Sequence, residues 1–227
     1  MKKATNTLLL IASILLLTGL YLAFFVAPVA MNGDRQMFSQ KIFYFHVPVA
    51  ETSLLAFIIG AVFGALFLIK KERKYDFLSL ASVELGFTFG ILVETTGVIW
   101  DRAAWGVWWQ WEPRLLTYLI LMFAYAGYFI LRSSIDEEST KARFGAVYSV
   151  IAAVTAPLTF FATRLVQSLH PVVFTSSGAQ LEHSMLVAFL ISMFGMTSFY
   201  VALLLMRYQM MLTAEEVDYL KNELGGY

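Results

Sequence analysis

Three histidines are the side chains of this sequence best suited to bind a metal ion. His46 lies in "KIFYFHVPVA", His170 in "VQSLHPVVF" and His183 in "QLEHSML". A neutral imidazole binds a metal through one ring nitrogen while the other nitrogen makes a hydrogen bond. An isolated histidine is more often an anchor or a hydrogen-bonding residue than a ligand, so these positions need support from their surroundings.

The second pattern is the stretch "WGVWWQWEPR", residues 105–114. All five tryptophans of the chain fall within twelve residues: Trp100, Trp105, Trp108, Trp109 and Trp111. Their spacing fits neither one face of a helix nor strand alternation. An aromatic belt at a membrane interface would spread its rings over several helix ends. We therefore interpret the cluster as a binding surface for a planar, apolar ligand, and a haem held by two imidazoles is such a ligand.

Composition limits the class of protein that carries these residues. The chain has 227 residues, of which 59% are hydrophobic and 14% charged, and its mean hydropathy is +0.70. These values are typical of a polytopic membrane protein. The net charge is zero, so no basic field favours nucleic acid. The sequence has no cysteine, which excludes disulfides, thiolate metal sites and dithiol exchange.

Six apolar segments have the roughly 17–25 residues that a membrane-spanning helix needs. They lie at 7–26, 47–69, 77–100, 115–131, 144–163 and 184–206, and predict an all-α fold of six transmembrane helices. The first could be a signal peptide. Its apolar run at 8–26 is longer than the about 7–15 residues of a signal sequence, so we interpret it as a retained helix.

Basic residues predict the orientation of these helices. With the N-terminus inside, eleven Lys and Arg residues lie in inner segments and five in outer segments. Because basic residues concentrate on the cytoplasmic side, both termini are expected to be cytoplasmic. Residues 1–206 then form the transmembrane domain, with outward loops at 27–46, 101–114 and 164–183, and residues 207–227 form a short cytoplasmic tail. The histidines and the tryptophan stretch all belong to the outward loops.

Helix boundaries place the histidines near that outer face. We expect His46 directly before a helix whose first turn accommodates Pro48. Pro171 prevents a helix from continuing through His170. His183 falls at the N-terminal end of the last helix.

Charged residues near the helices have structural and functional interpretations. Glu84 and Glu94 lie about 80° apart around the third helix, and we favour hydrogen-bonded structural roles for both. Glu51 either steadies the region of His46 or faces lipid headgroups. Arg114 and Arg164 are candidates to bind carboxylates such as haem propionates, although interfacial anchoring is the stronger expectation for Arg164.

The stretch "WGVWWQWEPRL" resembles the tryptophan-rich "WWD" segment of the haem-handling proteins of cytochrome c biogenesis, the CcmC/CcmF/CcsA superfamily. Trp105, Gly106, Trp109 and Trp111 match that segment, and Glu112 stands where the family has aspartate. The sequence "FHVP" ahead of the second helix is also similar to the family. The size of the chain and its helix count favour the CcmC type.

This resemblance implies a haem-binding and haem-transfer component rather than an enzyme. By similarity, His46 and His170 are the axial ligands of a transiently bound haem b, whereas His183 has no counterpart. The haem-contacting loop comprises Trp100, Trp105, Gly106, Trp108, Trp109, Trp111 and Glu112. The implied location is the cell (inner) membrane, with this loop facing outside or toward the periplasm.

The resemblance also implies partners. These are a membrane-tethered, CcmE-like haem chaperone, CcmA/CcmB-like subunits of an ABC transporter and a small single-helix, CcmD-like subunit. The sequence has no G-x-x-x-x-G-K-[ST] phosphate loop, so ATP hydrolysis would belong to a partner.

Two other classes of protein remain open. A b-type cytochrome anchor for electron transfer would place its histidines within helices. A cofactor-free transporter subunit would carry polar residues on several helices and a discontinuous pair of half-helices.

Overall fold

The computed structural model describes residues 2–29, 39–166, 170–171, 173–175, 178–179 and 181–225. Within these ranges nearly all residues are helical. The α-helices are α1 (Lys2–Tyr21), α2 (Phe43–Lys70), α3 (Arg73–Trp105), α4 (Pro113–Ser133), α5 (Glu138–Ala152), α6 (Thr155–Leu165) and α7 (His183–Glu223). A π-helical segment, η1 (Leu22–Val26), extends α1, and a 3-10 turn, η2 (Ser39–Ile42), precedes α2. Strands β1 (Phe174–Thr175) and β2 (Gly178–Ala179) form a short antiparallel pair.

Six helical segments of the described residues are long and apolar enough to cross a membrane, which confirms the predicted all-α polytopic fold. The fifth span differs in detail, because α5 and α6 are separate helices within it. Pro157 lies in the first turn of α6 and has no N–H to donate to the carbonyl group of Ala153. The helix is therefore interrupted before this proline: α5 ends at Ala152 and α6 begins at Thr155.

Helices α2 and α3 pack closely because small residues line their contact. Ser53 donates to the carbonyl oxygen of Gly86 at 2.7 Å, and Ser79 donates to that of Gly60 at 2.8 Å. A Cβ atom at Gly60 would lie 2.7 Å from Cγ2 of Val83. Small side chains and interhelical hydrogen bonds hold helices together in a bilayer, where lipid is as apolar as the helix surface.

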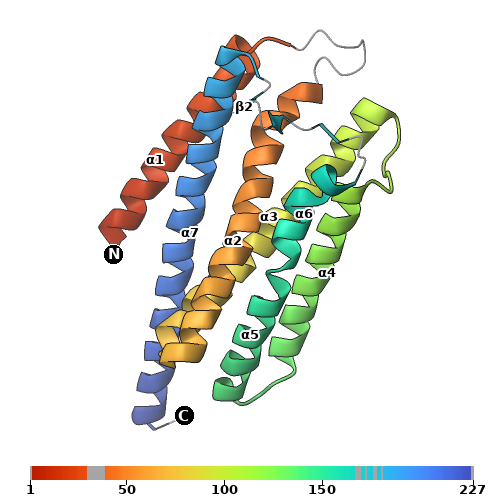
Figure 1. Ribbon diagram of the computed structural model, residues 1–227. Helices are drawn as coiled ribbons and strands as arrows, with labels where there is room; N and C mark the ends of the chain where they lie inside the picture. The colour runs from red at the N-terminus through yellow and green to blue at the C-terminus, as the bar shows by residue number, and fades with distance from the viewer. Residues whose placement is uncertain are drawn as a thin grey trace.

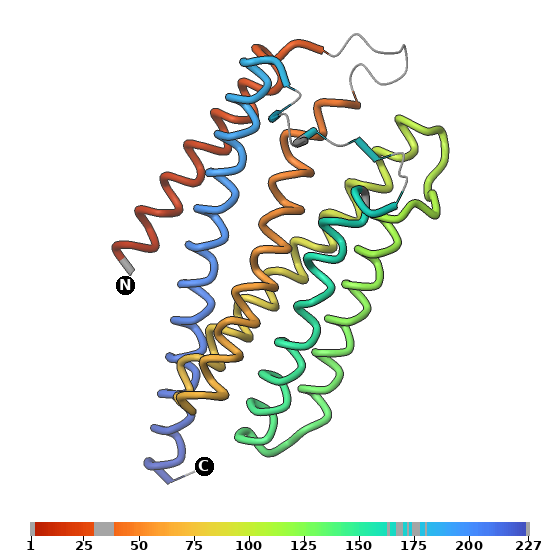
Figure 2. Tube along the Cα trace, in the orientation of Figure 1, coloured from red at the N-terminus to blue at the C-terminus, as the bar shows by residue number. Residues whose placement is uncertain are grey.

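Helix α7 runs beside α1 along one edge of the bundle (Figures 1 and 2). It is one continuous helix through Glu223, so residues 207–223 of the expected tail extend the last span. Arg207 on α7 makes two hydrogen bonds to Glu84 on α3, at 2.6 and 3.0 Å. Glu84 thus has the hydrogen-bonded structural role expected from the sequence.

A buried ion pair joins α3 and α4 at the end of the bundle where both helices meet short connections. Arg132 donates to the two carboxylate oxygens of Asp76 at 2.7 and 3.2 Å, and both residues are buried. At the opposite end lie the start of α2, the α3–α4 connection, the end of α6 and the start of α7 (Figures 1 and 2). That second end carries the histidines and the tryptophan stretch.

Candidate functional site

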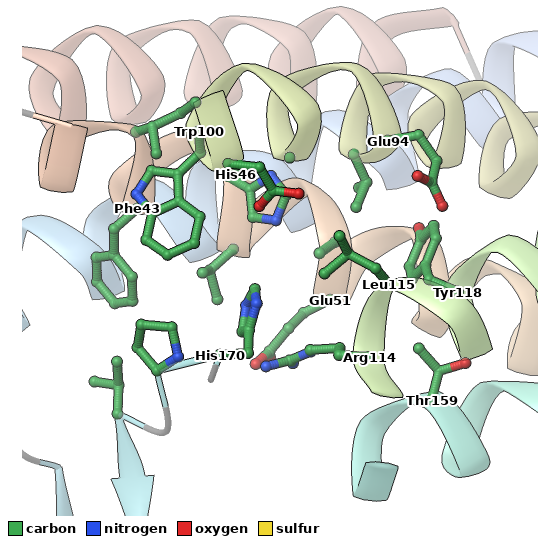
Figure 3. A pocket seen from close by; sticks show the side chains of 18 of the residues that line it. Phe43, His46, Glu51, Glu94, Trp100, Arg114, Leu115, Tyr118, Thr159 and His170 are labelled. Carbon is green, nitrogen blue, oxygen red and sulfur yellow. The ribbon is translucent and has the colours of Figure 1, made fainter. Parts of the chain in front are cut away.

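A cavity of about 590 Å³ lies at this end of the bundle (Figure 3). Its walls come from η2, α2, α3, the α3–α4 connection, α4, α6, α7 and residues 170, 171 and 173. Its volume falls within the range of about 300–1,000 Å³ that is typical of cofactor and small-molecule sites. Phe43, Leu54, Val93 and Phe189 make much of the wall apolar.

His46 enters the cavity from α2. The helix begins at Phe43, so His46 lies in its first turn rather than before it, and Pro48 lies inside the helix. Pro48 is the sixth residue of α2, beyond the first turn expected from the sequence, so it has no N–H to donate to the carbonyl oxygen of Tyr44. His46 packs against α3: its Nδ1 is 2.8 Å from Oγ1 of Thr96, and a Cβ atom at Gly97 would lie 3.4 Å from its Cε1.

His170 enters the same cavity from the segment between α6 and β1 (Figure 3). Its ring lies 5.8 Å from the ring of Trp100 and 6.5 Å from that of Trp105. Burial lowers the pKa of His170 to about 3, and the charges of Arg114 and His46 act in the same direction. The imidazole is therefore neutral at physiological pH, which is the form that can bind a metal.

The fold thus brings together side chains that are far apart in the sequence. His46 and His170 are 124 positions apart and line one cavity. The two candidate arginines, Arg114 and Arg164, line it as well. His183 does not belong to this group, since it is the exposed first residue of α7.

The tryptophans divide into two sets. Trp100 and Trp109 line the cavity, and Trp105 packs edge-on against Trp100 with ring centroids 4.9 Å apart. Trp108 and Trp111 are 61% and 78% exposed and point away from the interior. The stretch therefore presents one aromatic surface to the cavity and another to the surroundings.

Two residues of the stretch shape the loop. Gly106 ends α3 with φ +79°, a left-handed conformation that side chains disfavour, and Arg102 donates to its carbonyl oxygen. Glu112 is buried and is the N-cap of α4, where its carboxylate accepts from the backbone N–H of Arg114 at 2.9 Å and of Leu115 at 3.4 Å. Neither residue is among those that line the cavity. We predicted that both residues contact the ligand. In the structure, Gly106 ends α3 and Glu112 caps α4, so both set the course of the loop.

Three buried polar atoms of cavity-lining residues have no hydrogen-bond partner within the described part of the chain. They are Oε1 of Glu94, Oδ2 of Asp101 and Nε1 of Trp109. Oε1 of Glu94 therefore lacks, among the described residues, the hydrogen bond that we expected for this side chain. Buried polar groups in folded proteins almost always have a partner, so these atoms indicate water or polar ligand atoms in the cavity.

The two candidate arginines line another part of the cavity wall. Arg114 and Glu51 are directed toward one another in Figure 3. Arg164 donates to the carbonyl oxygen of Phe160 at 3.2 Å and covers the Phe160 ring at 4.7 Å. Arg164 is exposed and also lines the cavity.

Four lining residues named here were not singled out from the sequence: Phe43, Asp101, Tyr118 and Thr159. Thr96, which contacts His46 but does not line the cavity, was not singled out either. Of these residues, Asp101 could have been found from a sequence pattern. Val93, Gly97 and Trp100 recur at helical spacing with Glu94 and Asp101 beside them, which marks one face of α3. Tyr118 and Thr159 depend on how α4 and α6 pack, which no local pattern encodes.

The fold and this cavity define a multi-pass helical membrane protein with a large, mostly apolar cavity at one end of its bundle. The chain belongs to the CcmC family, described as heme exporter protein C, which matches residues 1–223.

Individual relatives agree with this family. The chain is 31% identical over 147 residues to heme exporter protein C of Rhodobacter capsulatus, covering 65% of this chain and 60% of that protein. It is 30% identical over 192 residues to heme exporter protein C of Bradyrhizobium diazoefficiens, covering 84% and 72%. A ccmC-like mitochondrial protein of Marchantia polymorpha, named for cytochrome c biosynthesis, is 30% identical over 170 residues, covering 74% and 71%. The first of these matches spans less than two thirds of the relative's length.

Proposed function

We propose that this protein binds haem b in the cavity between His46 and His170 and passes it to a CcmE-like chaperone for cytochrome c maturation. The observation that carries the proposal is the meeting of these two imidazoles in one aromatic-walled cavity. Two neutral imidazoles are sufficient to complete the coordination of a haem iron. The family and its relatives, named for heme export and cytochrome c biosynthesis, support the same role.

The remaining lining residues fit a haem. Trp100, Trp109 and Phe43 offer flat apolar surface for the ring, where each aromatic side chain can bury well over about 100 Å². Arg114 and Arg164 offer forked donors that suit the propionates. Stacking and burial would supply most of the affinity, and the imidazoles would set the orientation of the ring.

Release requires a surface that a chaperone can approach. Trp108 and Trp111 supply exposed aromatic surface directly beside the cavity wall formed by Trp109. We place this surface outside the cell or in the periplasm, because the basic residues favour the other end of the bundle for the cytoplasm. In this arrangement both termini are cytoplasmic.

The protein acts as a binding and transfer component rather than as an enzyme. Its sequence has no phosphate loop, so CcmA/CcmB-like subunits of an ABC transporter would hydrolyse ATP in the complex. A CcmD-like single-helix subunit completes the proposed assembly.

Haem titration of the purified protein tests the proposal. We expect a low-spin spectrum in the parent, and a high-spin or lost spectrum in both His46→Ala and His170→Ala. His183→Ala is the matched control, because His183 is exposed and is not among the residues that line the cavity. If the parent binds no haem, or if all three variants bind it alike, the two-histidine site is wrong.

A further inference from the structure

Thr96 on α3 is the hydrogen-bond partner of the His46 imidazole. Its Oγ1 lies 2.8 Å from Nδ1 of His46. The same Oγ1 lies 2.7 Å from the carbonyl oxygen of Leu92 and 3.2 Å from that of Val93. Both carbonyl groups belong to the preceding turn of α3, so the threonine hydroxyl bridges the helix backbone and the histidine.

These distances determine the direction of each hydrogen bond. A carbonyl oxygen only accepts, so the single hydroxyl proton of Thr96 points toward Leu92 and Val93. The hydroxyl oxygen can then only accept from His46, which means that Nδ1 carries a proton. With the opposite arrangement, Oγ1 would face two carbonyl oxygens at 2.7 and 3.2 Å with no proton between them.

We infer that Thr96 is a positioning residue that holds His46 in its Nδ1–H tautomer and so leaves Nε2 unprotonated and able to bind the haem iron. The inference rests on the proposed haem-binding function and adds a residue to its site. Metal-binding histidines generally donate their other ring N–H to a neighbouring acceptor, which fixes the tautomer, the ring orientation and the basicity of the ligand. The imidazole ring lies against α3 at Gly97, where a Cβ atom would be 3.4 Å from its Cε1.

The neighbouring residue provides a matched control. Thr95 makes the same type of bond within α3, from Oγ1 to the carbonyl oxygen of Ile91 at 2.8 Å, but it is exposed. Thr95→Val and Thr96→Val therefore remove the same hydroxyl group from the same helix. Only Thr96→Val removes the acceptor of His46.

The first measurement uses haem-free protein, so it does not depend on the cargo. Nitrogen NMR of ¹⁵N-histidine-labelled protein, with His46→Gln to assign the signal, reports which ring nitrogen of His46 carries the proton. We expect the Nδ1–H form in the parent, in Thr95→Val and in Thr96→Ser, and its loss in Thr96→Val. An Nε2–H form in the parent would overturn the inference even if haem binds.

The second measurement uses haem-loaded protein. Substitution of such partners typically weakens metal affinity about 10- to 100-fold, and we expect haem affinity to fall within this range in Thr96→Val. The reduction potential of the haem should shift to a more positive value, because a less basic imidazole stabilises the ferric form less. Thr96→Ser should restore both values toward those of the parent, and Thr95→Val should not change them.

The outcomes separate this inference from the proposed function. If Thr96→Val keeps the affinity, spectrum and potential of the parent, Thr96 does not position His46, although the haem site stands. If His46→Ala keeps a low-spin spectrum, the proposed coordination fails, and the positioning role of Thr96 toward haem fails with it.

Discussion

Lys41 places its ammonium group 2.7 Å from the carbonyl oxygen of Ala23 and so ties η2, which precedes α2, to η1, which extends α1. A second bond reaches the carbonyl oxygen of Ala27 at 2.6 Å. The last carbonyl groups of a helix have no partner within it, and a cation there also interacts favourably with the helix dipole. Lys41 is 8% exposed, so water does not replace these bonds easily.

Replacing Lys41 with methionine should therefore destabilise the protein. Hydrogen bonds to charged groups contribute about 1.5–3 kcal/mol, and we expect a loss of that order. Thermal unfolding in detergent, followed by tryptophan fluorescence, measures it. Lys221→Met is the control, since the Lys221 side chain is 71% exposed. An equal midpoint for both variants would show that Lys41 does not stabilise this junction.

Glu112 and Glu137 allow helix capping to be separated from ligand binding. Both carboxylates accept from backbone N–H groups at a helix start, Glu112 at α4 and Glu137 at α5. Loss of an N-cap typically costs about 0.5–2 kcal/mol, and Glu112→Ala should lower stability by this amount. It should also weaken haem binding, because α4 begins beside Trp109 and carries Arg114.

Glu137→Ala should lower stability without affecting haem binding, because α5 starts at the other end of the bundle. Unfolding curves and haem titrations of both variants give the comparison. Normal haem affinity in a destabilised Glu112→Ala would show that the cap does not position the cavity wall.

The sequence was sufficient to predict the helices but only part of the cavity. Apolar length gave the six spans, because a bilayer demands that length whatever the neighbouring helices are. His46, His170 and the tryptophan stretch stood out because such residues are unusual in an aliphatic chain. The contact between Thr96 and His46 depends instead on the register of α3 against α2, which small residues along both helices set. The ion pair of Glu84 and Arg207 spans 123 positions and likewise has no local pattern.

The division of the tryptophans predicts two separable defects. Trp109 lines the cavity, so Trp109→Ala should weaken haem binding about tenfold or more, given the energies of aromatic contact and burial. Trp111 is 78% exposed, so Trp111→Ala should bind haem normally but transfer it more slowly to a CcmE-like chaperone. Equilibrium titration and stopped-flow transfer measure the two properties. Equal effects of both variants on affinity would contradict the division.

His170 provides a prediction on pH. Burial lowers its pKa to about 3, and the charges of Arg114 and His46 contribute. An unfolded histidine titrates near pH 6.5, so below about this pH the unfolded chain binds a proton that folded His170 does not. This residue therefore makes the protein less stable as the pH falls from about 6.5 toward 3, and the loss ends below the folded pKa.

In the folded protein, the ¹⁵N signals of the His170 ring should stay those of a neutral imidazole between about pH 7.5 and 5. His170→Gln serves to assign these signals and should reduce the loss of thermal stability over the same range. If His170 titrates near pH 6.5 in the folded protein, its ring is not buried as described. Haem binding would then have to displace a proton from His170 at mildly acidic pH, and the affinity contributed by this ligand would fall with pH.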